Sequence, residues 1–172
     1  FYRNPNKIVA DQFQLMQKQQ VLFQNTVLRF LGKEAEPVIQ PEKDDRRFKD
    51  TEWTDNVMFD YIKQLYLLQS KSLTDMVTDV DGMSETSRKK VDYLMRQFVS
   101  ALAPTNFAGL NPEVIRKTLE TGGANLVDGM EQLLKDLDAS QAGSLNVSMT
   151  DMSAFTVGKN VATTEGKVVF QT

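Results

Sequence analysis

Apolar side chains recur every three or four residues along most of this 172-residue chain. This spacing places side chains on one face of an α-helix, and it persists from about residue 4 to residue 140. Glycine and proline interrupt the pattern at several places, so the chain is divided into successive helices. The sequence therefore predicts a mainly α fold in which the helices pack as a bundle.

The first predicted element is one long amphipathic helix from Asn4 to Leu31, within an N-terminal segment of residues 1–36. Its apolar side chains alternate at spacings of four and three, and Gln20 is the one interruption. Gly32 fits the position that follows a helix end. The candidate partner-binding stripe consists of Val9, Phe13, Met16, Phe23, Val27 and Phe30.

The apolar stripe of this helix needs a surface to cover it, because helix propensity alone rarely holds an isolated helix together. Ile8, Leu15 and Leu22 lie beside the stripe and widen it. Residues 1–31 carry a net charge of +3, from four basic side chains and one acidic one. The cover could be the rest of this chain, a second copy in a coiled coil, or an apolar particle. The sequence leaves these three alternatives open.

Residues 56–144 are predicted to form the helical bundle. Its first helix is apolar on several faces, so we expect this helix at the centre of the bundle. Ser84 is predicted to cap the next helix, which stops at Pro104. Asn111 and Pro112 form a strong start for a further helix.

The remaining segments differ in character from the bundle. Gly122 and Gly123 are predicted to separate the last two helices. Residues 37–55 read as a charged connector, in which acids beside arginines are more often salt-bridged or solvated than catalytic. Residues 145–172 are β-prone, with a predicted strand at residues 167–171 that would need a pairing partner.

The chain contains neither histidine nor cysteine, which excludes the commonest nucleophilic and thiolate-metal chemistries. We predict no catalytic residue, no metal site and no cofactor. The net charge of −3 without a basic stripe argues against nucleic acid. No apolar run approaches the roughly 20 residues that span a bilayer, so we expect no membrane span and a cytoplasmic protein.

Four ordered segments resemble a known family. They are DRRFKDTEW from residue 45, FDYIKQLYLL from residue 59, ALAPTNFAGLNPEVIRKTLETGGANLV from residue 101, and SMTDMSAFTVGKNVATTEGKVVF from residue 148. Together they resemble the N-terminal domain of class I poly(3-hydroxyalkanoate) synthases, bacterial polymerases that make polyhydroxybutyrate. The resemblance covers roughly residues 37–172. Within it, we expect structural roles for Asp45, Arg47, Phe48, Trp53, Pro104, Asn106, Asn111, Pro112, Gly122 and Gly123.

In that family the chemistry belongs to an α/β-hydrolase domain that follows this segment. The resemblance implies that the following domain joins (R)-3-hydroxyacyl groups from coenzyme A thioesters into polyester, using a cysteine, a histidine and an aspartate. None of these three has a counterpart here. The β-prone tail would lead into the sheet of that domain.

The resemblance implies that the present segment supports polymerisation without catalysing it. The implied partners are the catalytic domain, a second copy in a homodimer, the polyester granule surface and granule-associated proteins. The implied location is the cytoplasm, at the granules. The alternative reading is a stand-alone helical module that binds a protein partner or an apolar surface through its first helix.

Overall fold

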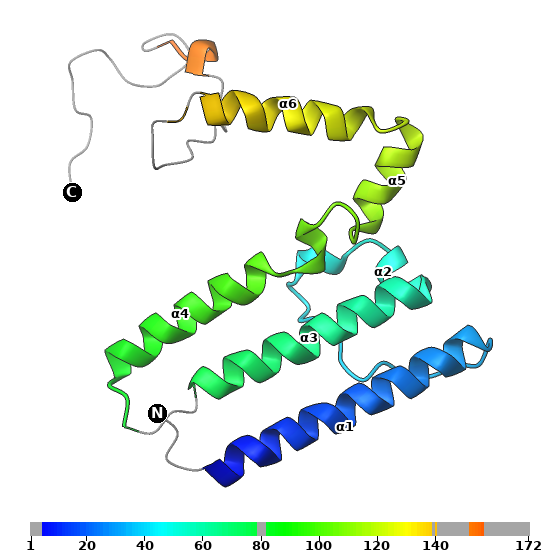
Figure 1. Cartoon of the computed structure of the whole chain (residues 1–172), viewed down its shortest axis with the longest axis vertical. Helices are drawn as coiled ribbons and strands as arrows, with labels where there is room; N and C mark the ends of the chain where they lie inside the picture. Colours follow the sequence, from blue (N-terminus) through cyan, green and yellow to red (C-terminus); the bar gives the residue numbers. More distant parts are fainter. Residues whose placement is uncertain (1–4, 79–81, 139, 141–151, 157–172) are drawn as a thin grey trace. The chain divides into compact units, whose positions relative to one another are not determined.

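The computed structural model describes residues 5–78, 82–138, 140 and 152–156, and these are drawn as coloured ribbon in Figure 1. The chain divides into two compact units, Phe1–Glu120 and Thr121–Thr172. Every regular element among the described residues is helical, which confirms the mainly α prediction. The predicted strand at residues 167–171 lies outside the described residues. The segment boundaries predicted at residues 36, 55 and 144 stay predictions.

The first unit is organised around one central helix. Helix α3 contacts α1, α2, α4 and the 3-10 turn η2, as expected for the centre of the bundle. The elements of the first unit, in chain order, are α1 (Pro5–Phe30), η1 (Arg46–Phe48), α2 (Glu52–Asp55), α3 (Val57–Thr78), α4 (Glu85–Ala101), η2 (Pro104–Asn106) and α5 (Pro112–Glu120).

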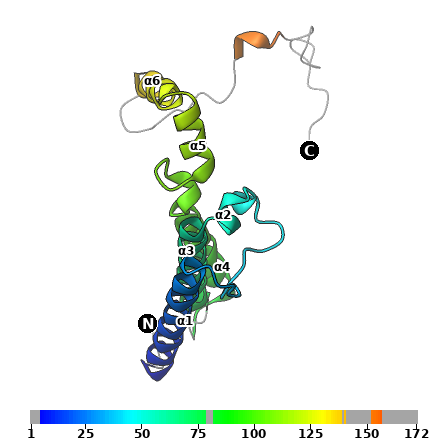
Figure 2. The same cartoon turned by 90° about the vertical axis from the view of Figure 1, so that its right-hand side faces the viewer.

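Helices α1, α3 and α4 lie side by side in a single layer, with α3 in the middle (Figure 1). Figure 2 shows this layer edge-on, with α2 and the connector that precedes it on one side only. Domains usually bury the apolar face of a layer against a second layer. In the described part of the first unit, α2 and the connector take the place of a second layer, and they cover one face.

The C-terminal end of α1 and the N-terminal end of α4 are capped by the residues that the sequence predicts. Gly32 takes a φ of 74°, and the amides of Gly32 and Lys33 donate to the Arg29 and Leu28 carbonyls at 3.0 Å each. This is the Schellman arrangement that ends a helix, because glycine accepts the left-handed conformation without strain. The Ser84 hydroxyl accepts a hydrogen bond from the Ser87 amide and caps α4 as predicted.

The second unit contains helix α6 (Ala124–Asp138) and the short 3-10 turn η3 (Met152–Ala154). Gly122 and Gly123, with φ of 60° and 91°, precede α6 and confirm the predicted break. The apolar stripe of α6 is exposed: its members are Leu126, Val127, Met130, Leu133, Leu134 and Leu137.

Candidate functional site

The stripe predicted on α1 lies on the surface of the molecule. Its six side chains keep between 40% (Val27) and 69% (Val9) of their area exposed. Monomeric soluble proteins rarely expose contiguous apolar patches of this kind, and such patches mark contact sites. The sequence left three possible covers for the stripe. The described part of this chain does not cover it.

A different row of side chains joins α1 to the centre of the unit. Leu22 is 1% exposed, Ile8 and Leu15 are half-buried, and Arg29 continues the row at the same spacing of seven. We expected Ile8, Leu15 and Leu22 to lie beside the stripe and widen it. They form instead, with Arg29, the face that packs on α3, about 130° around the helix axis from the middle of the stripe.

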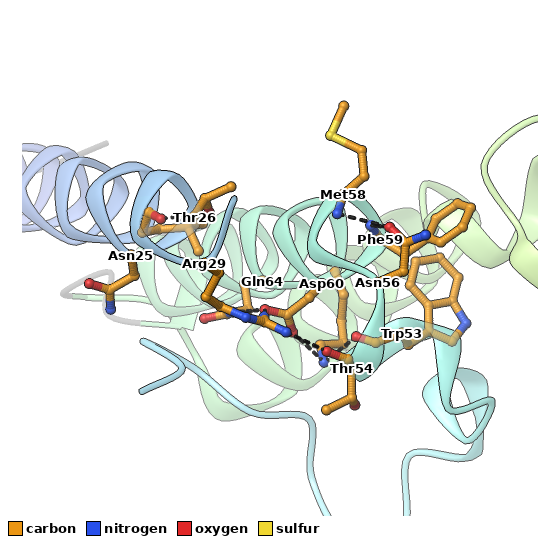
Figure 3. A network of polar contacts seen from close by, with 12 residues as sticks. Asn25, Thr26, Arg29, Trp53, Thr54, Asn56, Met58, Phe59, Asp60 and Gln64 are labelled. Carbon is orange, nitrogen blue, oxygen red and sulfur yellow. Dashed lines mark hydrogen bonds and ion pairs between the residues drawn. The ribbon is translucent and has the colours of Figure 1, made fainter. Parts of the chain in front are cut away.

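Helix α3 meets this row with a buried polar network, shown in Figure 3. The Asp60 carboxylate, in a residue only 5% exposed, is its centre. One carboxylate oxygen accepts hydrogen bonds from the Arg29 guanidinium and from Gln64 Nε2, the latter at 2.7 Å. The other oxygen lies 2.8 Å from Lys63 Nζ. A buried carboxylate is tolerable here because it is both charge-paired and hydrogen-bonded.

The two cations of the network also bind backbone carbonyls at the end of α2. Lys63 Nζ donates to the Trp53 carbonyl at 2.6 Å, and Arg29 Nη2 donates to the Thr54 carbonyl at 2.7 Å. The network therefore ties α1, α2 and α3 together at one place. In Figure 3 Met58 points away from these groups.

Hydrogen bonds also fasten the connector to the layer. Gln64 Oε1 accepts from the amides of Val38 and Ile39, at 2.7 and 3.3 Å. Asn25 Nδ2 donates to the Glu36 carbonyl at 2.8 Å. The segment predicted as a connector is thus packed across one face of the layer. We call residues 36–55 the strap.

Two acids of the strap form salt bridges with arginines, Asp45 with Arg47 and Asp50 with Arg116 of α5. Arg47 binds Asp45 through two hydrogen bonds, of 2.9 and 2.8 Å, and donates a third to the Tyr66 hydroxyl at 2.8 Å. Tyr66 in turn donates to the Val99 carbonyl on α4 at 2.9 Å. Hydrogen bonding from Arg47 holds the pKa of Asp45 below its usual value. Asp45 is therefore held in a structural ion pair, which is the more frequent reading of acids beside arginines.

An aromatic cluster lies beneath the strap. Trp53 is 1% exposed and Phe48 is 7% exposed, and their ring centroids are 5.1 Å apart in an edge-to-face arrangement. Phe59 packs on the other side of Trp53 at 5.7 Å. Such contacts give the strap its own apolar core.

The stripe on α1 faces away from the strap. Asn25, which binds the strap, lies on one side of the packing row that contains Leu22, and Phe23 lies on the other side. Exposed apolar side chains of the other two helices include Met58 on α3 and Phe98 on α4, at 55% and 54%.

The remaining motif residues hold the turns around α4 and α5. Asn106 Nδ2 donates to the carbonyls of Ser100 and Ala101, at 2.9 and 3.1 Å, and so ends α4. The Asn111 carboxamide accepts from the Glu113 amide at 3.0 Å and caps α5, as predicted. Pro104 and Pro112 are buried. In the structure these four residues form turn hydrogen bonds or lie buried at the turns.

The described residues contain no group of three or more His, Cys, Asp or Glu side chains that could hold a metal ion. Among the same residues, no helix is long and apolar enough to cross a membrane. The cleft between α1 and α3, of about 510 Å³, has a mixed lining that includes Ile8, Leu15 and Lys71. It lies on the strap side, and no stripe residue lines it.

Comparison with known proteins identifies the family of this chain. The family described as "Poly-beta-hydroxybutyrate polymerase (PhaC) N-terminus" matches residues 44–172. The chain belongs to this family. It is 44% identical over 169 residues to the poly(3-hydroxyalkanoate) polymerase of Methylorubrum extorquens, covering 98% of this chain and 28% of that protein.

Two further relatives agree. The chain is 37% identical to the polymerase subunit PhaC of Rhizobium meliloti (strain 1021), over 98% of this chain and 27% of the relative. It is 38% identical to the polymerase subunit PhaC of Cupriavidus necator, over 74% of this chain and 20% of the relative. The chain thus spans about a quarter of the length of these relatives. No solved structure matches it. The family resemblance seen in the sequence is confirmed.

Sequence reasoning missed the buried network. Asp60, Lys63 and Gln64 follow the spacing of three and four that a solvated polar face also shows. This local spacing gives no sign that the strap would cover them. The signal that could have found them is Arg29, the one cation in register with the packing row of α1.

Proposed function

We propose that this chain is the non-catalytic N-terminal domain of a poly(3-hydroxyalkanoate) polymerase. It supports the joining of (R)-3-hydroxyacyl groups into polyester by a separate catalytic domain, through dimer stabilisation and through contact with the granule surface and granule-associated proteins. Family membership supports the assignment to the polymerase. The absence of histidine and cysteine supports the division of labour, because the acyl-transfer groups then come from another domain.

One observation carries the contact role: the exposed stripe on α1. On the opposite side of α1, Asn25 binds the strap and Arg29 pairs with Asp60. Helix α1 therefore cannot rotate to bury the stripe without breaking these two contacts. The stripe therefore stays available for another surface. Helix α6 offers a second exposed apolar face in its own unit.

The contact role is tested with a triple variant, Phe13→Ser, Phe23→Ser and Phe30→Ser. We expect weaker binding to particles of poly(3-hydroxybutyrate), weaker self-association, or both, measured by co-sedimentation and by sedimentation velocity. The matched control is Val21→Ser with Leu28→Ser, exposed apolar positions of α1 outside the stripe. If the triple variant folds, self-associates and binds particles like the parent chain, the stripe is not the contact.

The non-catalytic role has its own test. The purified chain should release no coenzyme A from (R)-3-hydroxybutyryl-coenzyme A above the rate without protein. Measurable release that depends on this chain would contradict the proposal.

A further inference from the structure

The exposed stripe of α1 has a stricter pattern than a general apolar surface needs. From Val9 to Phe30 its members keep the alternating spacing of four and three over three heptads, and Gln20 is the one polar residue in the series. This is the pattern of the a and d positions that form the seam of a coiled coil. In this register the a positions are Phe13, Gln20 and Val27, and the d positions are Val9, Met16, Phe23 and Phe30.

The residues beside the seam carry no charge. In a coiled coil the e and g positions flank the seam, and like charges there repel a second copy. The e positions are Ala10, Gln17, Gln24 and Leu31, and the g positions are Gln12, Gln19 and Thr26. Two copies of α1 can therefore approach seam to seam without like charges meeting at the flanks.

The packing on α3 leaves this seam free. The row that includes Leu22 and Arg29 falls on the c positions of the same heptads, about 130° from the middle of the seam. One helix can therefore contact α3 and a second copy together. A seam of this length suits another helix better than a flat surface, which needs no regular spacing.

Gln20 selects the orientation of the two helices. In a parallel pair, equivalent a positions lie side by side, so the two Gln20 carboxamides can hydrogen-bond to each other. In an antiparallel pair an a position meets a d position, which puts Gln20 against Met16 or Phe23. A buried carboxamide without a polar partner is costly, so the parallel pair is favoured.

We propose that α1 pairs with α1 of a second copy of this chain in a parallel, two-stranded coiled coil with Gln20 as its polar layer. This inference rests on the proposed function, since it names the occupant of the α1 stripe. The polar layer keeps the two helices in register at some cost in affinity.

The orientation is tested by disulfide cross-linking, which the cysteine-free chain allows without background. Gln20→Cys should form a covalent dimer under mild oxidation, because equivalent a positions face each other. Asp11→Cys, an exposed f position of the same helix, is the control and should not cross-link above its random-collision level. A mixture of Met16→Cys and Gln20→Cys chains that cross-links to each other, while Gln20→Cys alone does not, would overturn the parallel arrangement.

The energetic role of the polar layer is tested by sedimentation equilibrium. Gln20→Leu should tighten the dimer by about tenfold or more, and Gln20→Lys should weaken it by a similar factor. Circular dichroism checks that both variants keep the helical fold. Because position 20 is exposed in the single chain, neither substitution disturbs its packing. Equal dimer affinities for the parent and both variants would place the dimer contact elsewhere.

The particle-binding experiment separates this inference from the proposed function. A chain that stays monomeric, yet loses polyester binding in the Phe13, Phe23 and Phe30 triple variant, has a granule-facing stripe. That result overturns the coiled coil and leaves the proposed function standing. A chain that forms no Gln20→Cys dimer and whose triple variant binds particles normally contradicts both.

Discussion

Helices α1 and α3 reverse the usual distribution of polar and apolar side chains. Helix α3 buries Asp60, Lys63 and Gln64, whereas α1 exposes Phe13 and Phe23. The charges of α3 are tolerated because each has a counter-charge or a carbonyl within hydrogen-bond distance. In the described part of the chain, no surface covers Phe13 or Phe23. The comparison teaches that burial follows the available partners and not polarity alone.

The two helices also differ in what a change would cost. A buried ion pair adds little net stability, but removing one member leaves the other charge uncompensated. Exposed apolar side chains add little to the fold, yet covering one fully gains about 1.5–3 kcal/mol. We therefore expect substitutions on α3 to report on stability and substitutions on the stripe to report on association.

The largest expected effect compares two neighbours on α1. Leu22→Ala should lower the free energy of unfolding by about 2–4 kcal/mol, because Leu22 is 1% exposed and truncation leaves a cavity. Phe23→Ala, at a side chain 60% exposed, should change it by less than about 0.5 kcal/mol in the monomer. Urea unfolding at low protein concentration measures both. Equal losses for the two variants would mean that α1 does not pack on α3 by the Leu22 row.

A second comparison uses two aspartates of α3. Asp60→Asn keeps the shape of the side chain but removes the counter-charge of Lys63 and Arg29, and should cost about 2 kcal/mol. Asp75→Asn removes an exposed pair with Lys71 and should cost less than about 0.5 kcal/mol. Both are measured by denaturant unfolding at neutral pH. A cost for Asp75→Asn as large as that for Asp60→Asn would remove the distinction between a buried network and a surface pair.

The smallest expected effect is a loss of stability in acid. The pKa of Asp45 is lowered in the folded chain by Arg47, so its contribution is complete above the unfolded value near 4 and is lost as pH falls through the folded value. We expect less than about 1 kcal/mol, because Arg47 is partly exposed and solvent screens the pair.

Asp45→Asn should therefore flatten the pH dependence of unfolding below about pH 4 relative to the parent chain. Asp44→Asn, beside it in the strap but outside the Arg47 pair, is the control. An unchanged acid slope in Asp45→Asn would show that the pair contributes nothing to folding.

Much of the fold could be read from the sequence, since helix ends are decided locally. Ser84, Asn111 and Gly32 cap or end helices through bonds within a few residues, and each was predicted. The network around Asp60 could not be predicted in the same way. It depends on a strap that returns across the layer, and nothing in the local pattern of α3 encodes that return.

The candidate site also has a part that is visible within one segment and a part that depends on distant segments. Periodicity found the stripe on α1, because seven-residue repeats are visible in one segment. It placed Ile8, Leu15 and Leu22 beside the stripe and did not single them out as a packing row, because this row has fewer apolar members than the stripe. Arg29, the polar member of the row, gains its partners only from Asp60 of α3 and from the Thr54 carbonyl.

The strap also bears on how the N-terminus can be studied. A truncation that removes residues 1–36 deletes the exposed stripe and, in the same step, the buried Leu22 and the guanidinium that binds Asp60 and the Thr54 carbonyl. Such a truncation combines loss of a contact surface with damage to the remaining layer. Point substitutions on the stripe separate these two effects.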